Sequence, residues 1–231
     1  MITQDDIDGF SQDSPSIKVT HIDHMGNDLS VVNAARVSFG KQSNWTYTEG
    51  YDRRPELSRS DAKLIKYLAS HSHFSPFGHC FASFHISAPL FVARQLVKHK
   101  FLRWNEISRR YVSDTPEFYR PEAWRGHNPD KKQGSSGIVN IILDDEVQWH
   151  RQLSTYQTLL SEGVCPEQAR MVLPQSMMTE WYWSGSLDAF ADMCVLRCAS
   201  DTQAETRVVA DGISEEMNAH WPVSWPALTS N

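Results

Sequence analysis

Residues 95–111 of the chain read QLVKHKFLRWNEISRRY, and this segment is the most informative part of the sequence. It carries five Lys or Arg side chains and one His, with apolar residues interleaved among them. Before it, Pro89 suits a first helical turn, and Leu90–Lys98 predicts a helix. The charges lose helical spacing past Lys100, so we expect the helix to end there.

This concentration of charge suits a phosphorylated ligand. An arginine fork binds phosphate oxygens through two parallel hydrogen bonds, and a lysine supplies a compact charge. Ser108 and nearby backbone N–H groups would complete the shell of the anion, and Glu106 would accept from ribose hydroxyls or from the N–H of a base. The alternative is a solvated basic loop, because runs of charge usually face solvent.

The composition favours a small ligand over a long nucleic acid. The 231 residues carry a net charge of -6, whereas polyanion binders usually have a basic surplus. The acidic, polar residues 1–14 do not resemble a signal peptide, and no window approaches the roughly 20 apolar residues that span a bilayer. We therefore expect a cytoplasmic protein that binds neither membrane nor nucleic acid.

The pattern of elements predicts an α+β fold. We expect a single domain over residues 1–231, with a mixed or antiparallel sheet packed by long helices. Expected strands cover residues 17–22, 80–87 and 174–183; expected helices cover 29–37, 90–98, 139–160 and 187–210, with one capped by Asp61 that ends near His71 and a short one that begins at Pro166. Residues 40–57 and 112–137 are expected to be connections. Helices and strands do not alternate strictly, which disfavours a doubly wound sheet.

The histidines and cysteines lack the spacing of a metal site. His71, His73 and His79 have no accompanying acidic or cysteine ligand, and Cys194 and Cys198 have no further ligand nearby. We therefore predict no metal, reduced cysteines, and a polar pocket lining for residues 71–79.

Two arginines, Arg170 and Arg197, are embedded in apolar runs. An arginine in such a context is rarely buried without a partner. One interpretation is ligand binding. The other is a structural ion pair, for example between Arg197 and Asp201 at the i+4 position.

Segment 95–111 resembles the signature of the flavin-dependent thymidylate synthases, the thymidylate synthase complementing protein family. In that family a basic-His-basic triplet is followed after seven residues by Ser, within an Asn-Glu-x-Ser-x-Arg-Tyr context. Here the corresponding residues are Lys98-His99-Lys100 and NEISRRY at 105–111. The resemblance extends over about residues 30–210 through NAARVS (33–38), SPFGH (75–79), APLFVARQ (88–95), ARMVLP (169–174) and Leu196-Arg197.

This chain departs from the family pattern at several positions. Lys98 and Lys100 replace the two arginines of the triplet, which keeps the charge and loses the bidentate fork. Gly78 stands where the family often has Glu, Asp192 where some relatives have Asn, and Asp201 where some have His. These departures concern individual flavin contacts.

The resemblance implies a homotetramer of α+β subunits that binds FAD and dUMP at subunit interfaces. Carried over by position, the cofactor-binding residues are His73, Ser75, Lys98, His99, Lys100, Glu106, Ser186, Leu187, Asp188 and Asp192. The substrate-binding residues are Gln95, Leu96, Val97, Lys98, Glu106, Ile107, Ser108, Arg109, Arg110, Arg170 and Arg197. Arg197 is also the predicted catalytic residue, facing the uracil edge and stabilising charge that develops there.

The implied reaction is reductive methylation of dUMP to dTMP. NADPH reduces the flavin, 5,10-methylenetetrahydrofolate delivers the carbon to uracil C5, and the reduced flavin supplies hydride. Ser108 is expected to orient the nucleotide and not to act as a nucleophile, because the motif holds no adjacent general base.

Two alternatives remain open. The first is flavin- and folate-dependent transfer of another one-carbon unit, such as hydroxymethyl, to a pyrimidine nucleotide. The second is a non-catalytic nucleic-acid-binding protein that uses residues 98–110 as a basic patch. The acidic balance of the chain counts against the second alternative.

Overall fold

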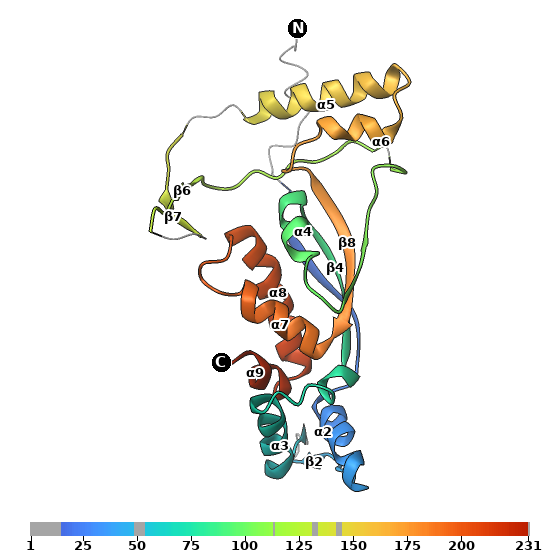
Figure 1. Ribbon diagram of the computed structural model, residues 1–231, viewed down its shortest axis with the longest axis vertical. Helices are drawn as coiled ribbons and strands as arrows, with labels where there is room; N and C mark the ends of the chain where they lie inside the picture. The colour runs from blue at the N-terminus through green and yellow to red at the C-terminus, as the bar shows by residue number, and fades with distance from the viewer. Residues whose placement is uncertain (1–14, 49–53, 113, 131–133, 142–144, 231) are drawn as a thin grey trace.

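The computed structural model describes residues 15–48, 54–112, 114–130, 134–141 and 145–230. The strands are β1 (Lys18–Met25), β2 (Thr46–Tyr47), β3 (Pro55–Glu56), β4 (Phe81–Pro89), β5 (Leu102–Glu106), β6 (Arg125–His127), β7 (Ser135–Ile138) and β8 (Met178–Ser186). The helices are α2 (Asp28–Arg36), α3 (Arg59–Ser70), α4 (Leu90–Leu96), α5 (Asp145–Ser161), α6 (Pro166–Ala169), α7 (Leu187–Arg197), α8 (Ala204–His220) and α9 (Ser224–Thr229). The molecule is elongated, with α5 and α6 at one end and α2 and α3 at the other (Figure 1).

Four strands form an antiparallel sheet in the order β1-β4-β8-β5. The central pair joins β4 and β8 from Phe81 opposite Ser186 to Pro89 opposite Met178. Every second residue of β4 is buried, because successive side chains of a strand point to opposite faces and one face meets the helices. The predicted antiparallel sheet of an α+β fold is therefore confirmed.

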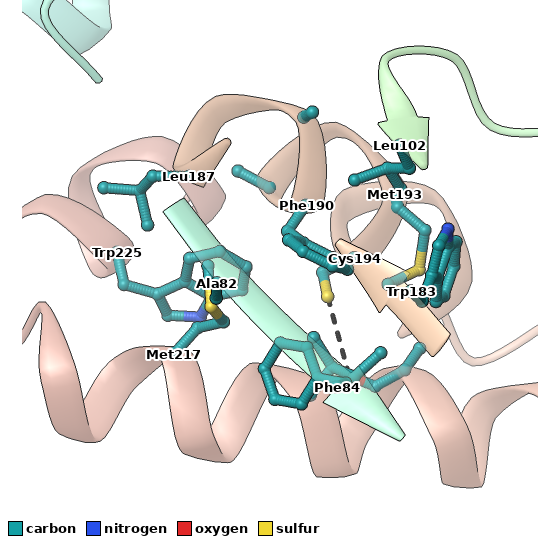
Figure 2. Packing of buried hydrophobic residues seen from close by; sticks show 14 of the residues in the cluster. Ala82, Phe84, Leu102, Trp183, Leu187, Phe190, Met193, Cys194, Met217 and Trp225 are labelled. Carbon is teal, nitrogen blue, oxygen red and sulfur yellow. Dashed lines mark hydrogen bonds between the residues drawn. The ribbon is translucent and has the colours of Figure 1, made fainter. Parts of the chain in front are cut away.

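Helices α7 and α8 cover one face of this sheet (Figure 1). Phe84 of β4 and Trp183 of β8 both meet the ring of Phe190 edge to face, at centroid distances of 5.3 and 5.5 Å. Figure 2 shows these rings packed with Met193 of α7 and Met217 of α8. All five side chains are buried, so sheet and helices share one apolar core.

A second, smaller core lies between α5, α6 and the segment that precedes β8. Its buried members are Phe118, Leu153, Tyr156, Ala169 and Met177. Phe118 and Met177 also pair through an isolated antiparallel bridge. This cluster ties the chain between β5 and β6 to the end of the molecule that carries α6.

The helix predicted over residues 187–210 is wrong as a single element. It divides into α7, which ends at Arg197, and α8, which begins at Ala204. Between them, Thr202 Oγ1 donates to the carbonyl of Leu196 at 3.1 Å. This side chain takes up a free carbonyl at the end of α7, so the backbone turns instead of continuing.

Other boundaries also differ from the prediction. Residues 139–141 are not helical, α5 begins at Asp145, and residues 142–144 of the predicted helix lie outside the described part of the chain. Strand β5 and helix α9 lie in segments for which no element was expected, and the segments expected to be connections hold two small two-stranded sheets, β2-β3 and β6-β7. Among the described residues, no helix has the length and apolar character needed to cross a membrane.

Ser58, and not Asp61, caps α3: the Asp61 N–H donates to Ser58 Oγ at 3.1 Å. Asp61 instead centres a polar contact between α2 and α3. One carboxylate oxygen accepts from Arg36 Nε at 3.0 Å, Arg36 Nη2 at 2.5 Å and Ser43 Oγ at 2.9 Å, and the other accepts from Ser58 Oγ at 2.8 Å. The side chain of Asp61 is 3% exposed.

The protonation of Asp61 follows from these contacts. Burial alone would raise the pKa of Asp61, but hydrogen bonds from Arg36, Ser58 and Ser43 outweigh it and hold the pKa below its usual value. Arg36 belongs to the NAARVS motif. In the folded chain it therefore connects two helices.

Candidate functional site

The basic segment lies in a tight turn between α4 and β5. Helix α4 ends at Leu96, whose carbonyl accepts from the His99 N–H at 3.1 Å, and Phe101 has a φ of 64°. Strand β5 then begins with Leu102 opposite Gly185 of β8. A Cβ on Gly185 would lie 2.2 Å from Leu102 Cδ2, so glycine at this position permits the close approach that fixes the turn.

Arg197 meets His99 at this turn. Arg197 is the last residue of α7, and its Nε donates to His99 Nε2 at 3.0 Å. Within the described part of the chain, its two Nη groups make no hydrogen bond and it forms no ion pair with Asp201. The structural alternative of an Arg197–Asp201 pair is therefore wrong, and the guanidinium keeps two donor groups for a ligand.

His99 is neutral near pH 7. Desolvation by burial, and then the positive charge of Arg197, lower the pKa of His99 to about 4. Because His99 Nε2 accepts a hydrogen bond, the proton of the neutral ring belongs on Nδ1. A neutral imidazole can orient Arg197 without cancelling its charge.

These side chains line a cavity of about 350 Å³. The lining residues are Lys98, His99, Lys100, Phe101, Ala189, Asp192, Leu196 and Arg197. Five of them were predicted as site residues, and they come together from the α4–β5 turn and from α7. Three cationic side chains against one carboxylate make the cavity suited to an anion. Phe101, Ala189 and Leu196 were not predicted, since apolar lining residues carry no sequence signal that separates them from core.

Asp192 also lines a neighbouring cavity of about 310 Å³. The other lining residues are Ala69, Ser70, Ser72, Phe74, Asp188, Ala191, Val195, Ala227 and Leu228. Asp188 Oδ1 is buried and has no hydrogen-bond partner among the described residues. Partial desolvation, and then the carboxylate of Asp188, raise the pKa of Asp192. This part of the site therefore offers acceptors that lack a donor.

Two predicted cofactor residues, His73 and Ser75, flank this second cavity without lining it. Both are exposed, and the ring of His73 meets Tyr67 edge to face at 6.1 Å. The lining positions in this loop belong to their neighbours Ser72 and Phe74. The predicted residues therefore alternate along this loop with the residues that line the cavity.

Two other predicted contacts lie in the core. The side chains of Leu96 and Leu187 are fully buried within it, so neither is available to a ligand. The N–H of Leu187 donates to the carbonyl of Cys80 at 2.9 Å, and Ser186 occupies the N-cap position of α7 without a capping hydrogen bond from its side chain. Any ligand contact of Leu96 or Leu187 would therefore have to come from the backbone, whereas the side chain of Val97 is 44% exposed.

The remaining predicted substrate residues gather beyond the other end of β5. Arg110 Nη1 lies 3.5 Å from the carboxylate of Glu167 in α6, and Arg170 Nε donates to the Glu167 carbonyl at 3.3 Å. Ser108 Oγ accepts from the Arg110 N–H at 3.3 Å, and Arg109 bonds to the Asp114 carbonyl.

This distal group, defined as Ile107, Ser108, Arg109, Arg110 and Arg170, is separated from the cavity. Strand β5 spans four residue steps from its first to its last residue, or about 13 Å. The backbone of Ile107 continues this strand, since its N–H donates to the Glu180 carbonyl at 2.9 Å. The side chain of Ile107 is exposed. One chain therefore holds the predicted substrate residues in two places.

Glu106, predicted to contact both the flavin and the nucleotide, is the last residue of β5 and lies between the cavity and the distal group. Its Oε1 accepts from Thr179 Oγ1 at 2.8 Å and its Oε2 from Trp104 Nε1 at 3.1 Å. These donors keep the carboxylate in a defined orientation.

Gln95 borders a third cavity that no prediction covered. Its side-chain amide bonds to Gln203, which lines a cavity of about 450 Å³ together with Phe91, Ala123, Trp124, Arg125, Gly134, Ser135 and Glu205. Both carboxylate oxygens of Glu205 accept from Arg125 Nη2, at 2.6 and 2.7 Å. The pair joins two segments 80 residues apart, which no local sequence pattern indicates.

Comparison with known proteins decides the family. The model of the thymidylate synthase complementing protein family matches residues 20–223. This chain belongs to that family. A flavin-dependent thymidylate synthase of Thermus thermophilus is 39% identical over 214 residues, which cover 90% of this chain and 73% of that protein. One from Kosmotoga olearia is 37% identical, covering 90% and 87%.

Solved structures agree with the family assignment. The UMP/dUMP methylase PolB from Streptomyces cacaoi, bound with 5-Br dUMP, has a TM-score of 0.76 and 31% identity, covering 94% of this chain and 96% of that one. The same enzyme bound with 5-Br UMP has a TM-score of 0.73 and 30% identity, covering 93% and 94%. The predicted resemblance is therefore confirmed.

Proposed function

We propose that the chain methylates dUMP to dTMP with a flavin cofactor. One observation carries the proposal. In a member of the thymidylate synthase complementing protein family, Lys98, Lys100 and Arg197 line one cavity beside a neutral His99. Relatives named flavin-dependent thymidylate synthase share 37–39% of the sequence over 90% of this chain.

Within the cavity, the cations have separate roles in holding the nucleotide. Lys98 and Lys100 are exposed at its wall and supply mobile point charges for phosphate. Arg197, oriented through its Nε by His99, directs its two Nη groups at the planar edge of uracil. As negative charge develops on the ring carbonyl oxygens, this fixed cation stabilises it.

The residues present fit a flavin. The buried Asp188 Oδ1 lacks a donor, and the isoalloxazine and adenine groups of FAD both offer N–H donors. Asp192 lines both cavities, so a ligand along the second cavity would reach the nucleotide cavity. Together Asp188, Asp192 and the loop of Ser72 and Phe74 would hold the cofactor, with Ser186 at the N-cap position of α7 beside them. When bound, the flavin supplies hydride to the transferred carbon.

We propose NADPH as the reductant and 5,10-methylenetetrahydrofolate as the carbon donor. Both come from the family resemblance. Ser108 orients the substrate: its hydroxyl faces the N–H and Nε of Arg110 and has no neighbouring base to remove its proton.

We also propose that a complete site needs two chains of a homotetramer. The support is the distance of about 13 Å along β5 between the cavity and the distal group. Co-expression of an Arg197→Ala chain with an Arg110→Ala chain tests this. If each site combines the cavity of one chain with the distal group of another, about a quarter of the sites in mixed oligomers are intact. Activity no higher than that of either variant alone would contradict shared sites.

The main test replaces Arg197 by Ala and, as a matched control, the exposed Arg103 on the neighbouring strand by Ala. The Arg197→Ala variant should lose about a hundredfold or more in turnover while it keeps its flavin absorbance per chain. The Arg103→Ala variant should retain both. Near-normal turnover of Arg197→Ala with dUMP would refute the role assigned to Arg197.

A second candidate substrate follows from the solved neighbours. They are described as methylases of UMP as well as dUMP and were solved with both brominated nucleotides. Assays should therefore compare UMP with dUMP and determine the mass of the product. A product heavier than the substrate by one hydroxymethyl group would support transfer of another one-carbon unit instead of methylation.

A further inference from the structure

Three histidines that line none of the cavities described above form a cluster at the edge of the sheet. His21 and His24 belong to β1, and His220 is the last residue of α8. One ring nitrogen from each lies within 4.8 Å of the other two. The ring of His220 stacks on His24 at a centroid distance of 3.8 Å and lies 4.5 Å from that of His21.

A β-bulge brings the two β1 histidines to one face. In a regular strand, residues three apart point to opposite faces. Here His21 pairs with Phe84 and Asp23 with Ser83, so Ile22 is an extra residue in β1. His24 then pairs with Ala82, and both histidines face the side on which Phe84 and Ala82 are buried.

Helix α8 lies against this same face. A Cβ on Gly212 would lie 3.1 Å from Val19 Cγ2, so α8 approaches β1 at a glycine. Two turns later the helix ends at His220, beside the bulge. Figure 1 shows β1 as the blue strand beside β4, on the edge of the sheet. The cluster is therefore built by a bulge, a glycine contact and a helix terminus.

The chemistry of the cluster suits a cation that imidazole binds. His21 Nε2 is buried and has no hydrogen-bond partner among the described residues. A buried polar atom without a partner is unusual, and a bound ion would explain it. Glu216, one turn before His220, places Oε2 4.0 Å from His220 Nε2.

We infer that His21, His24 and His220 form a site for a divalent transition-metal ion of the Zn²⁺ class. Three imidazoles with a water or the Glu216 carboxylate supply the four ligands that Zn²⁺ prefers, at about 2.0–2.1 Å from nitrogen. The stacked ring of His24, which is exposed and also meets the ring of Trp221 edge to face at 5.5 Å, has to rotate to reach this geometry.

We assign the site a structural role, because none of its three histidines lines the cavities of the proposed catalytic centre. Strand β1 is one edge of the sheet and β5, which follows the basic turn, is the other. Two strands lie between them, a separation of about 14 Å. Bound metal would fasten the end of α8 to β1. The histidines are 3 and 196 residues apart along the chain, so no sequence spacing predicts the site.

Zn²⁺ titration of the tag-free, metal-depleted full-length holoenzyme tests this inference. All proteins carry Cys165→Ser, because that exposed thiol would itself bind zinc. The parent protein should bind one Zn²⁺ per chain and show a higher midpoint of thermal unfolding with Zn²⁺. His24→Ala and His220→Ala should each weaken binding at least about tenfold and abolish the shift. His127→Ala, which removes an exposed histidine elsewhere, should change neither.

Co²⁺ provides an independent readout. Bound by the parent protein, it should develop the intense visible absorption of a four-coordinate ion, and His24→Ala should not. The exposure of His24 makes its removal compatible with folding, and methylation of dUMP by His24→Ala should stay normal. Failure of the parent to bind Zn²⁺, or equal binding by His24→Ala, would overturn the site and leave the proposed function untouched.

Discussion

The contact between Arg36 and Asp61 gives a stability prediction that the structure allows to be quantified. Replacing Arg36 by Leu leaves a carboxylate that is 3% exposed with only serine side chains as donors. Removing one partner of a buried ion pair typically costs 3–5 kcal/mol. Since the Arg36 side chain is 24% exposed, water can reach the vacated position, and we expect about 3 kcal/mol at pH 7.

The coupling between the two residues provides the decisive comparison. Urea unfolding of wild type, Arg36→Leu, Asp61→Leu and the double variant should be followed by tryptophan fluorescence at one protein concentration. The double variant leaves no unpaired charge, so its loss should be smaller than the sum of the single losses by about 2 kcal/mol. Arg103→Leu serves as the control for an exposed arginine.

The pH dependence has a defined sign. The pKa of Asp61 is depressed in the folded state, so its stabilisation is present above the unfolded pKa and is lost as pH falls through the folded pKa. Without Arg36, the hydrogen bond and the positive charge that lower this pKa are lost, so the pKa is higher than in wild type and acid protonates the carboxyl more easily. The difference in unfolding free energy between wild type and Arg36→Leu should therefore shrink in acid. Additive single losses, or a difference that grows in acid, would refute this account.

Three further predictions follow from the site. Lys98→Ala should weaken both nucleotide and flavin binding at least about tenfold, measured by equilibrium titration; unchanged affinity for both would contradict shared contacts. Gly185→Ala should destabilise the fold by about 1–3 kcal/mol, because the new methyl group meets Leu102, whereas Gly137→Ala, with open space around it, should not. For His99, the folded pKa of about 4 lies below the unfolded 6.5, so the unfolded state binds more protons between these values and stability is lost as the pH is lowered through that window. After discounting for solvent screening, wild type should lose about 1–2 kcal/mol relative to His99→Gln between pH 7 and pH 4, and equal losses would show that His99 is not desolvated.

The sequence predicts the elements whose patterns are local. Alternation in the β4 region and the Pro166 start of α6 both appear as expected. The break at Thr202 was not predictable, because it depends on a side chain that bonds back to the preceding helix, and the apolar spacing continues across it. Strand β5 was not predicted, because its basic sequence does not alternate and its pairing partner is remote in the sequence. Gly185 of β8, which pairs with Leu102, lies 83 positions after it.

The site was predictable in its chemistry and less so in its geometry. Family motifs identified Lys98, His99, Lys100 and Arg197, which the fold brings to one cavity. Motifs do not distinguish side chains that face a cavity from those that face the core, and the side chain of Leu96, a predicted substrate residue, lies in the core. The orientation of each side chain depends on strand register and helix ends, which nonlocal packing determines.

The smaller core bears on how the protein responds to heat. It holds five fully or nearly buried side chains, far fewer than the main core, and one of them, Ala169, is the last residue of α6 and directly precedes Arg170. Segments with few buried contacts open at lower free energy than the rest of a fold, so amide hydrogens of α5 and α6 should exchange with solvent first. Affinity for the nucleotide would then decline on warming while the sheet is still intact, and catalysis would fail at a temperature below that of denaturation.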